Sequence, residues 1–176
     1  MFVTGTGPAL GESAPDWMLK SIVGPNAFAG ANGMRFDAAA DLWGSFGPWR
    51  RDRSDQPSDQ RHGAFLATGS RHPISGHLDF DSSGTAYVTE FPHGRVTELQ
   101  PNGDSRRIYD IFGANGIVVF EDRIIIDQCV EEGRVLEVFR DGAEPRVIVE
   151  HAPWSDALDV SADGYVYYPL LKAGEV

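Results

Sequence analysis

The sequence predicts an all-β protein, a β-propeller built from about four blade-sized repeats. The 176-residue chain contains 20 Gly and 11 Pro, which favours short elements joined by many turns over long helices. The segment GANGMRF at 30–36 returns as GANGIVV at 113–119. Weaker copies lie between and beyond these two segments, which indicates that the chain repeats one structural unit.

Each repeat begins with the pattern of a half-buried strand. The copies align on Asn32, Gly76, Asn115 and Asp156, called here the rim positions, at intervals of 44, 39 and 41 residues. Apolar residues stand two and four places after each rim position: Met34 and Phe36, Leu78 and Phe80, Ile117 and Val119, and Leu158 and Val160. This period of two predicts a strand with one buried face at the start of every repeat.

The rest of each repeat predicts three further strands. Turns at 81–84, 121–123 and 161–164 lead into β-rich runs at 87–89, 124–126 and 165–168. GRVTEL at 94–99 and GRVLEV at 133–138 each pass through another glycine-containing turn into a fourth run. Four short antiparallel strands in about 40 residues are typical of a propeller blade. We therefore expect one domain over 1–176, either a small closed ring or part of a six-bladed ring.

Three segments depart from regular repetition. MFVTGT at the start resembles a second strand, and AGEV at the end matches only the beginning of EGRV, so both termini fall within a blade. If the chain is part of a larger ring, its open sheet edges predict self-association. The segment 47–63 is polar and unpatterned, which indicates a solvated loop. A basic docking patch is the alternative for this segment, although its aspartates cancel much of the charge.

The charge balance restricts the partners of the chain. With 15 Lys and Arg against 26 Asp and Glu, the formal net charge is −11, so nucleic acid and membrane surfaces are not expected partners. Cys129 is the single cysteine and cannot form an internal disulfide. Because the N-terminal stretch lacks the pattern of a secretion signal, we expect a soluble cytoplasmic protein.

The rim positions are the candidate site. The first strand of a propeller blade is innermost, so these residues would surround the central channel. The amide oxygens of Asn32 and Asn115 and the carboxylate of Asp156 are hard donors suited to Ca²⁺ or Mg²⁺. The alternative is structural, because Asn-Gly and Ser-Asp also form turns and satisfy local backbone groups.

Two segments, GANGIVVFEDRIIIDQ and PWSDALDVSADGYVYY, resemble successive blades of a known family. It is the six-bladed propeller family named for gluconolactonase, senescence marker protein and luciferin-regenerating enzyme, and the similarity runs from about residue 30 to the end. The resemblance implies a divalent cation at the channel mouth, held by a Glu, an Asn and an Asp. Asn115 and Asp156 would be two of these ligands. Asn32 would be a further polar group lining the channel, and it is a candidate for cation and for substrate binding. Calcium is the expected ion, with Mg²⁺, Mn²⁺ or Zn²⁺ as alternatives.

The chain departs from the family pattern in two places. Glu12, in LGESAP, lies about half a blade before Asn32, so repeat spacing does not place it on the same ring. Gly76 stands where the family tends to have a polar substrate-binding residue, which leaves the neighbouring Ser75 and His77 as candidates. Trp154, close to Asp156, is a further candidate for substrate binding.

The resemblance implies metal-assisted hydrolysis of a small lactone or sugar-derived ester. Asp156 would act both as a ligand and as the catalytic residue that orients water, while the cation polarises the carbonyl. A non-catalytic binding or scaffold propeller and a lyase-type propeller are the alternatives. The sequence contains no nucleophile elbow, P-loop, CxxC pair or HExxH motif, so serine hydrolase, NTPase and zinc peptidase functions have no support.

Overall fold

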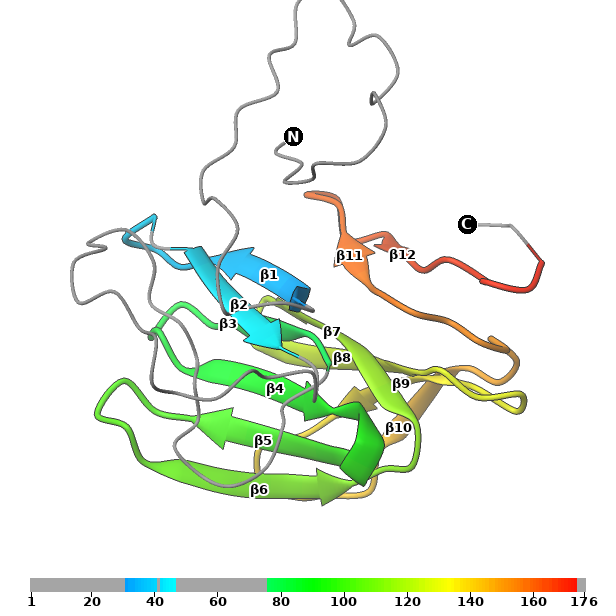
Figure 1. Cartoon of the computed structure of the whole chain (residues 1–176), viewed down its shortest axis with the longest axis horizontal. Helices are drawn as coiled ribbons and strands as arrows, with labels where there is room; N and C mark the ends of the chain where they lie inside the picture. The colour runs from blue at the N-terminus through cyan, green and yellow to red at the C-terminus, as the bar shows by residue number, and fades with distance from the viewer. Residues whose placement is uncertain (1–30, 41, 47–75, 174–176) are drawn as a thin grey trace, which may run out of the picture.

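The computed structural model describes residues 31–40, 42–46 and 76–173, and their strands form four antiparallel sheets (Figure 1). The predicted strand at 2–4, Glu12 and the polar segment 47–63 lie outside these residues. The first sheet contains β1 (Ala31–Phe36) and β2 (Leu42–Phe46). The second contains β3 (Leu78–Phe80), β4 (Ala86–Glu90), β5 (Arg95–Leu99) and β6 (Ser105–Asp110), with the 3₁₀ helix η2 (Phe91–His93) after β4.

The third and fourth sheets continue the same arrangement. The third contains β7 (Ala114–Phe120), β8 (Arg123–Gln128), β9 (Val135–Val138) and β10 (Arg146–Val149). The fourth contains the short strands β11 (Asp159–Val160) and β12 (Val166–Tyr167). Among the described residues, no helix is long and apolar enough to cross a membrane. The prediction of an all-β chain is confirmed.

The sheets are arranged as the blades of a propeller. Each strand of the two four-stranded sheets pairs with its neighbours in the chain, and the orders are β3-β4-β5-β6 and β7-β8-β9-β10. The first strands contact one another in sequence, β1 with β3, β3 with β7 and β7 with β11 (Figure 1). The first strand of each blade is therefore innermost, and the four sheets form an arc of a propeller.

Hairpin turns fall where glycine was expected to form them. Gly103 connects β5 to β6 with a φ of 92°, and Gly142 connects β9 to β10 with a φ of 78°. Both angles lie in the left-handed region, where glycine has no steric penalty. The turn between β7 and β8 uses Glu121 and Asp122 instead, with φ values of 47° and 63°. Positive φ at both central residues is typical of a two-residue hairpin turn whose twist matches that of its strands.

The core consists of layers between adjacent sheets. One layer joins the second and third sheets and contains Tyr87, Val96, Ile117, Ile124, Ile126, Leu136 and Val138. Another joins the third and fourth sheets and contains Val118, Ile125, Val135 and Leu158. The sequence predicted one buried face for β7, but Ile117 and Val118 are both buried. The third blade packs against the second blade on one side and the fourth on the other, so both faces of β7 and β8 are apolar.

The first repeat differs from the prediction in its exposed side chains. Met34 and Phe36 were expected to be buried, but they are 61% and 54% exposed. In the later blades, the residues two and four places after the rim position face the preceding sheet. No described sheet precedes β1, so this face of it is uncovered. The opposite face packs on the second blade, where Trp43 contacts Phe80 edge to face at 5.5 Å between ring centroids.

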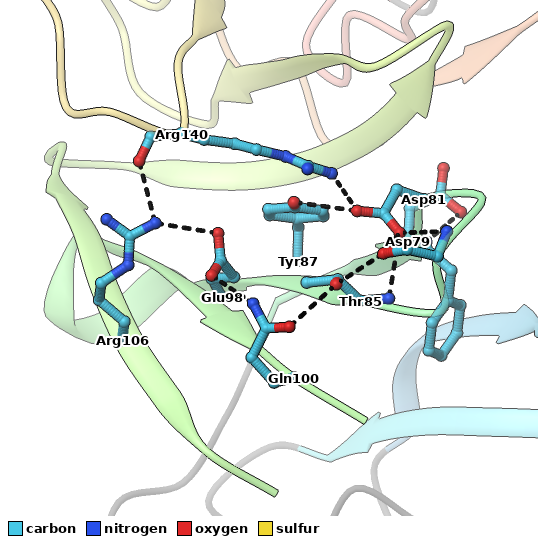
Figure 2. Close-up of polar contacts among 10 residues, drawn as sticks. Asp79, Asp81, Thr85, Tyr87, Glu98, Gln100, Arg106 and Arg140 are labelled. Atoms are coloured by element: carbon cyan, nitrogen blue, oxygen red, sulfur yellow. Dashed lines mark hydrogen bonds and ion pairs between the residues drawn. The ribbon is translucent and has the colours of Figure 1, made fainter. Parts of the chain in front are cut away.

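A buried carboxylate joins a turn of the second blade to a turn of the third (Figure 2). Asp81, in the turn between β3 and β4, accepts hydrogen bonds from the backbone N of Ser83 at 2.8 Å and of Thr85 at 3.1 Å. The Tyr87 hydroxyl donates to the same carboxylate at 3.1 Å. Arg140, from the third blade, forms an ion pair with Asp81 and lies over the Tyr87 ring at 5.2 Å. This cluster connects two neighbouring blades.

Candidate functional site

The two Asn-Gly rim positions coincide with irregularities in strand pairing. In β7 the register with β8 shifts between Ala114 and Ile117, which places Asn115 and Gly116 in a bulge. In β1 the register with β2 shifts between Ala31 and Met34, at the equivalent place. A bulge turns a side chain out of the regular alternation of a strand. The repeated Asn-Gly pair therefore marks a repeated local geometry at the inner end of a blade.

The structure brings Asn115 and Asp156 together. The Asn115 side-chain amide Nδ2 donates a hydrogen bond to Oδ1 of Asp156, across the junction between the third and fourth blades. Asn115 is buried, with 3% of its surface exposed, whereas Asp156 is half-buried. Within the described residues, this amide is the only hydrogen-bond partner of the Asp156 carboxylate. The pair therefore presents one anionic group and one neutral amide at the same point.

Gly76, the rim position of the second blade, has no room for a side chain. A Cβ atom at this position would overlap the backbone oxygen and the hydroxyl of Thr89. The adjacent His77 donates its backbone N–H to Thr89 Oγ1 at 2.9 Å, and the Thr89 hydroxyl also contacts the backbone oxygen of Asn115. Gly76 itself therefore cannot supply the polar side chain that the family pattern predicts in this blade.

The pKa of His77 is influenced by its burial and by nearby charged residues. Burial lowers the pKa of its imidazole below the ordinary value of 6.5, while Asp127 and Asp156 act in the opposite direction. Arg35, on β1, adds to the lowering. Because the net shift is downward, the ring is neutral near pH 7 and can accept a proton. In the sequence, His77 was a candidate for substrate binding only because it neighbours Gly76.

The third and fourth blades also share a buried carboxylate that the sequence did not predict. Asp127, on β8, accepts hydrogen bonds from the backbone N of Gly116, from the Ser155 hydroxyl and from the backbone N of Ala157. Burial raises the pKa of this carboxyl, although the three donors oppose the shift. The only available signal was a polar residue at the end of an apolar run, as in IIIDQ.

A cluster of charged residues lies further along the first strands of the blades, three residues after the rim positions. Arg35 binds Asp79 through two hydrogen bonds, Nε to Oδ1 at 2.8 Å and Nη2 to Oδ2 at 3.1 Å. The same guanidinium is 3.8 Å from the carboxylate of Asp159 on β11. Asp79 also accepts the backbone N–H of Val119 at 2.8 Å. This group connects the inner strands of all four sheets and was not predicted from the sequence.

The remaining predicted residues are placed only in part. Ser75 lies outside the described residues, as does the side chain of Asn32, whose backbone belongs to β1. Trp154 has a φ of 56°, and the ammonium of Lys172 lies 4.1 Å from its ring centroid. Its indole Nε1 is buried and has no hydrogen-bond partner among the described residues. Among the described residues, no hydrogen bond joins Trp154 to Asn115 or Asp156.

The chemistry of Asn115 and Asp156 fits a hard divalent cation, and the two side chains would supply part of its coordination. Ca²⁺ takes six to eight oxygen ligands, including carboxylates and amide carbonyls, so Asn115 and Asp156 are suitable donors. Among the described residues, no group of three or more His, Cys, Asp or Glu side chains is placed to hold a metal. Softer metals that prefer thiolate or several imidazoles are a poorer match to this pair.

The rim depends on close contact between neighbouring blades at Gly116. A Cβ atom there would lie 2.7 Å from Asp127 Oδ2 and 2.8 Å from the backbone carbon of Ala157. We expect Gly116→Ala to lower the free energy of unfolding by about 2 kcal/mol, because backbone and a buried carboxylate must shift. Urea unfolding measures this loss.

Gly142→Ala provides a control for this crowding. Gly142 has a φ of 78°, and a Cβ atom added there would meet no atom within 4 Å, so the substitution should cost about 1 kcal/mol from backbone strain alone. Equal losses for the two variants would contradict the tight contact between the third and fourth blades at Gly116.

Comparisons with known proteins support the fold. No family model matches the sequence, and no curated protein matches it significantly. A streptogramin B lyase structure superposes with a TM-score of 0.61 at 15% identity, covering 84% of this chain and 50% of the lyase. A virginiamycin B lyase from Staphylococcus aureus gives a TM-score of 0.57 at 13% identity, covering 82% of this chain and 50% of that one.

A gluconolactonase from Xanthomonas campestris also matches, with a TM-score of 0.44 and 17% identity over 49% of this chain and 31% of that one. That partial match adds nothing to the fold assignment. The chain spans about half the length of the two lyases. At these identities the similarity establishes architecture alone. The sheet order, the contacts between first strands and the lyase superpositions together identify the chain as an arc of a β-propeller.

Proposed function

We propose that the chain belongs to an enzyme that hydrolyses a small lactone or sugar-derived ester with the help of a divalent cation. The observation that carries the proposal is the meeting of Asn115 and Asp156 at the junction of two blades. A carboxylate and an amide oxygen at the inner end of a propeller blade supply ligands of the kind that Ca²⁺ prefers. The gluconolactonase resemblance of these same two segments supports the choice of substrate class.

The residues of the rim have separable roles in this reaction. A cation held by Asn115 and Asp156 would supply Lewis acidity toward the ester carbonyl. The Asn115 amide binds one carboxylate oxygen of Asp156, and in this proposal the other oxygen holds the attacking water. His77 follows the rim position Gly76 in the chain and is the candidate to accept the proton that this water loses, because burial keeps its imidazole neutral near pH 7. The water oxygen bonds to the acyl carbon, the ester C–O bond breaks, and the departing oxygen takes the proton back from His77. A lactone therefore opens to one hydroxy acid, and an open-chain ester gives an acid and an alcohol.

Calorimetry and a lactone assay test this proposal directly. Ca²⁺, Mg²⁺, Mn²⁺ and Zn²⁺ are titrated separately into chelator-treated protein, and acid release from a panel of sugar-derived lactones is then followed at constant pH. We expect saturable binding of one cation per chain and acid release that requires it. Absence of both would favour the scaffold alternative, in which the hydrogen bond between Asn115 and Asp156 is structural.

Elimination is the second candidate reaction, because a neutral His77 would serve it as a base as well as it would serve hydrolysis. A neutral imidazole beside the rim can remove a carbon-bound proton, after which a C=C bond forms and the carboxylate leaves. The structures with similar folds include lyases, and one of these carries a His-to-Ala substitution described as catalytically inactive. Mass spectrometry in oxygen-labelled water separates the reactions, because only hydrolysis incorporates solvent oxygen into the acid.

In either reaction His77 should contribute to rate more than to cation binding. We expect His77→Ala to lower kcat about a hundredfold, the usual contribution of a general base, with Ca²⁺ affinity unchanged in calorimetry. An unchanged kcat would assign the proton transfer to another group. An equal loss of cation affinity would instead indicate that the substitution disturbs the rim.

A further inference from the structure

Asp127, on β8, is the most completely buried acidic residue of the part of the chain that the structure describes, with 0% of its surface exposed. Its Oδ1 accepts the backbone N–H of Gly116 at 2.6 Å. Its Oδ2 accepts the Ser155 hydroxyl at 2.6 Å and the backbone N–H of Ala157 at 3.1 Å. Because no part of it is exposed, Asp127 cannot contact a substrate in this structure, and any effect on a reaction must pass through these three partners.

The three partners of Asp127 are the chain neighbours of the two rim residues. Gly116 directly follows Asn115, and Ser155 and Ala157 stand on either side of Asp156. One carboxylate oxygen therefore holds the rim of the third blade and the other holds the rim of the fourth. Since a carboxylate is rigid and planar, it fixes the separation of the two backbones more closely than independent contacts within each blade would.

The second blade contains a simpler version of this connection. Thr89, on β4, occupies the place of Asp127, because Val88 before it pairs with Leu78 as Ile126 pairs with Ile117. The Thr89 hydroxyl accepts the backbone N–H of His77 at 2.9 Å and contacts the backbone oxygen of Asn115 in the next blade. The position is therefore used twice to join one rim to the next. Of these two residues, Asp127 alone provides two acceptor oxygens.

We infer that Asp127 is a positioning residue that holds Asn115 and Asp156 side by side and so orients their oxygens for an oxygen-ligated divalent cation. The role in cation binding rests on the proposed function, whereas the role in holding the pair together does not. Residues that orient metal ligands by hydrogen bonding typically change metal affinity or activity by about 10- to 100-fold when they are replaced. Asp127 differs from such groups in acting through backbone on both sides.

Asp127→Asn tests this role with little change in shape. The variant keeps one acceptor oxygen but places an NH₂ group against either Gly116 or Ala157, both of which are donors. We expect the side-chain amide signals of Asn115 in nitrogen–proton correlation spectra to shift and to exchange faster with solvent. We also expect the Ca²⁺ dissociation constant to rise about 10- to 100-fold.

Two further variants keep the test decisive. Ser155→Ala removes one of the three hydrogen bonds and should give a smaller shift of the same Asn115 signals, which also decides the question if Asp127→Asn fails to fold. Glu137→Gln alters a buried carboxylate of the same blade, which binds Arg123 and Arg146 away from the rim, and should leave the Asn115 signals in place.

The outcomes separate this inference from the proposed function. Unchanged Asn115 signals in folded Asp127→Asn and in Ser155→Ala would overturn the positioning role, and so would equal shifts in Glu137→Gln. Shifted Asn115 signals with no Ca²⁺ binding by the unmodified chain would support the positioning role and refute the cation site. Shifted signals with weakened Ca²⁺ binding would support both.

Discussion

Replacing Asp156 with Asn is expected to abolish cation-dependent ester cleavage and leave the fold intact. The substitution removes the negative charge of the pair while preserving its size, and Ca²⁺ affinity depends strongly on the charge of the ligands. We expect the dissociation constant for Ca²⁺ to rise, and the rate at fixed Ca²⁺ to fall, by about a hundredfold or more. Asp156 is half-buried and forms no ion pair with another described residue, so thermal unfolding should change little.

Asp163→Asn is the matched control for this experiment. Asp163 lies in the turn between β11 and β12, is exposed, and accepts a hydrogen bond from the Ser161 hydroxyl at 2.5 Å. Both variants change the net charge equally, so a general electrostatic effect would weaken Ca²⁺ binding in both. Equal Ca²⁺ binding by Asp156→Asn and the unmodified chain would show that the cation binds at another place. It would refute the proposed role of the Asn115–Asp156 pair in holding the cation.

Local sequence signals were sufficient to predict the architecture because each blade is assembled from its own hairpins. The 41-residue separation of Asn115 and Asp156 equals about one blade, so equivalent positions in a ring predicted that they would be neighbours. Turn chemistry at Gly103 and Gly142 likewise depends on adjacent residues, and the positive φ values followed. These features needed no knowledge of how one blade packs on another.

Contacts between blades were the part that the sequence could not predict. Asp127 and Thr89 are equivalent in the fold but 38 residues apart, while the rim positions of their blades are 39 apart, because the second blade has a longer first turn. A one-residue difference of this kind hides equivalence from simple spacing. The burial of Val118 and the exposure of Met34 also depend on which sheet covers each face, which is a property of the assembled blades.

The same limitation applies to the cluster around Asp81, where the largest loss of stability is expected. Asp81→Ala removes the acceptor for backbone donors at Ser83 and Thr85 and leaves the fully buried Tyr87 without its carboxylate partner. It also breaks the ion pair with Arg140. We expect the free energy of unfolding at pH 7 to fall by about 3 kcal/mol, measured by urea unfolding.

The pH dependence of this loss distinguishes the charge of Asp81 from its shape. Burial raises the pKa of the Asp81 carboxyl, but hydrogen bonds from Ser83, Thr85 and Tyr87 outweigh it and bring the pKa below the ordinary value of 3.8. A carboxyl with a lowered pKa contributes stability that is fully present above its unfolded pKa and is lost as the pH falls through its folded pKa.

The stability difference between the unmodified chain and Asp81→Ala should therefore be constant from pH 7 to about pH 5 and shrink below pH 3.8. Asp141→Ala is the control, because Asp141 is an exposed turn residue that accepts one backbone hydrogen bond, from Ala143 at 3.0 Å. Its loss should be below about 1 kcal/mol. A difference for Asp81→Ala that stays constant down to pH 3 would show that the lost stability comes from packing, because protonation of the carboxyl would then have no effect on it.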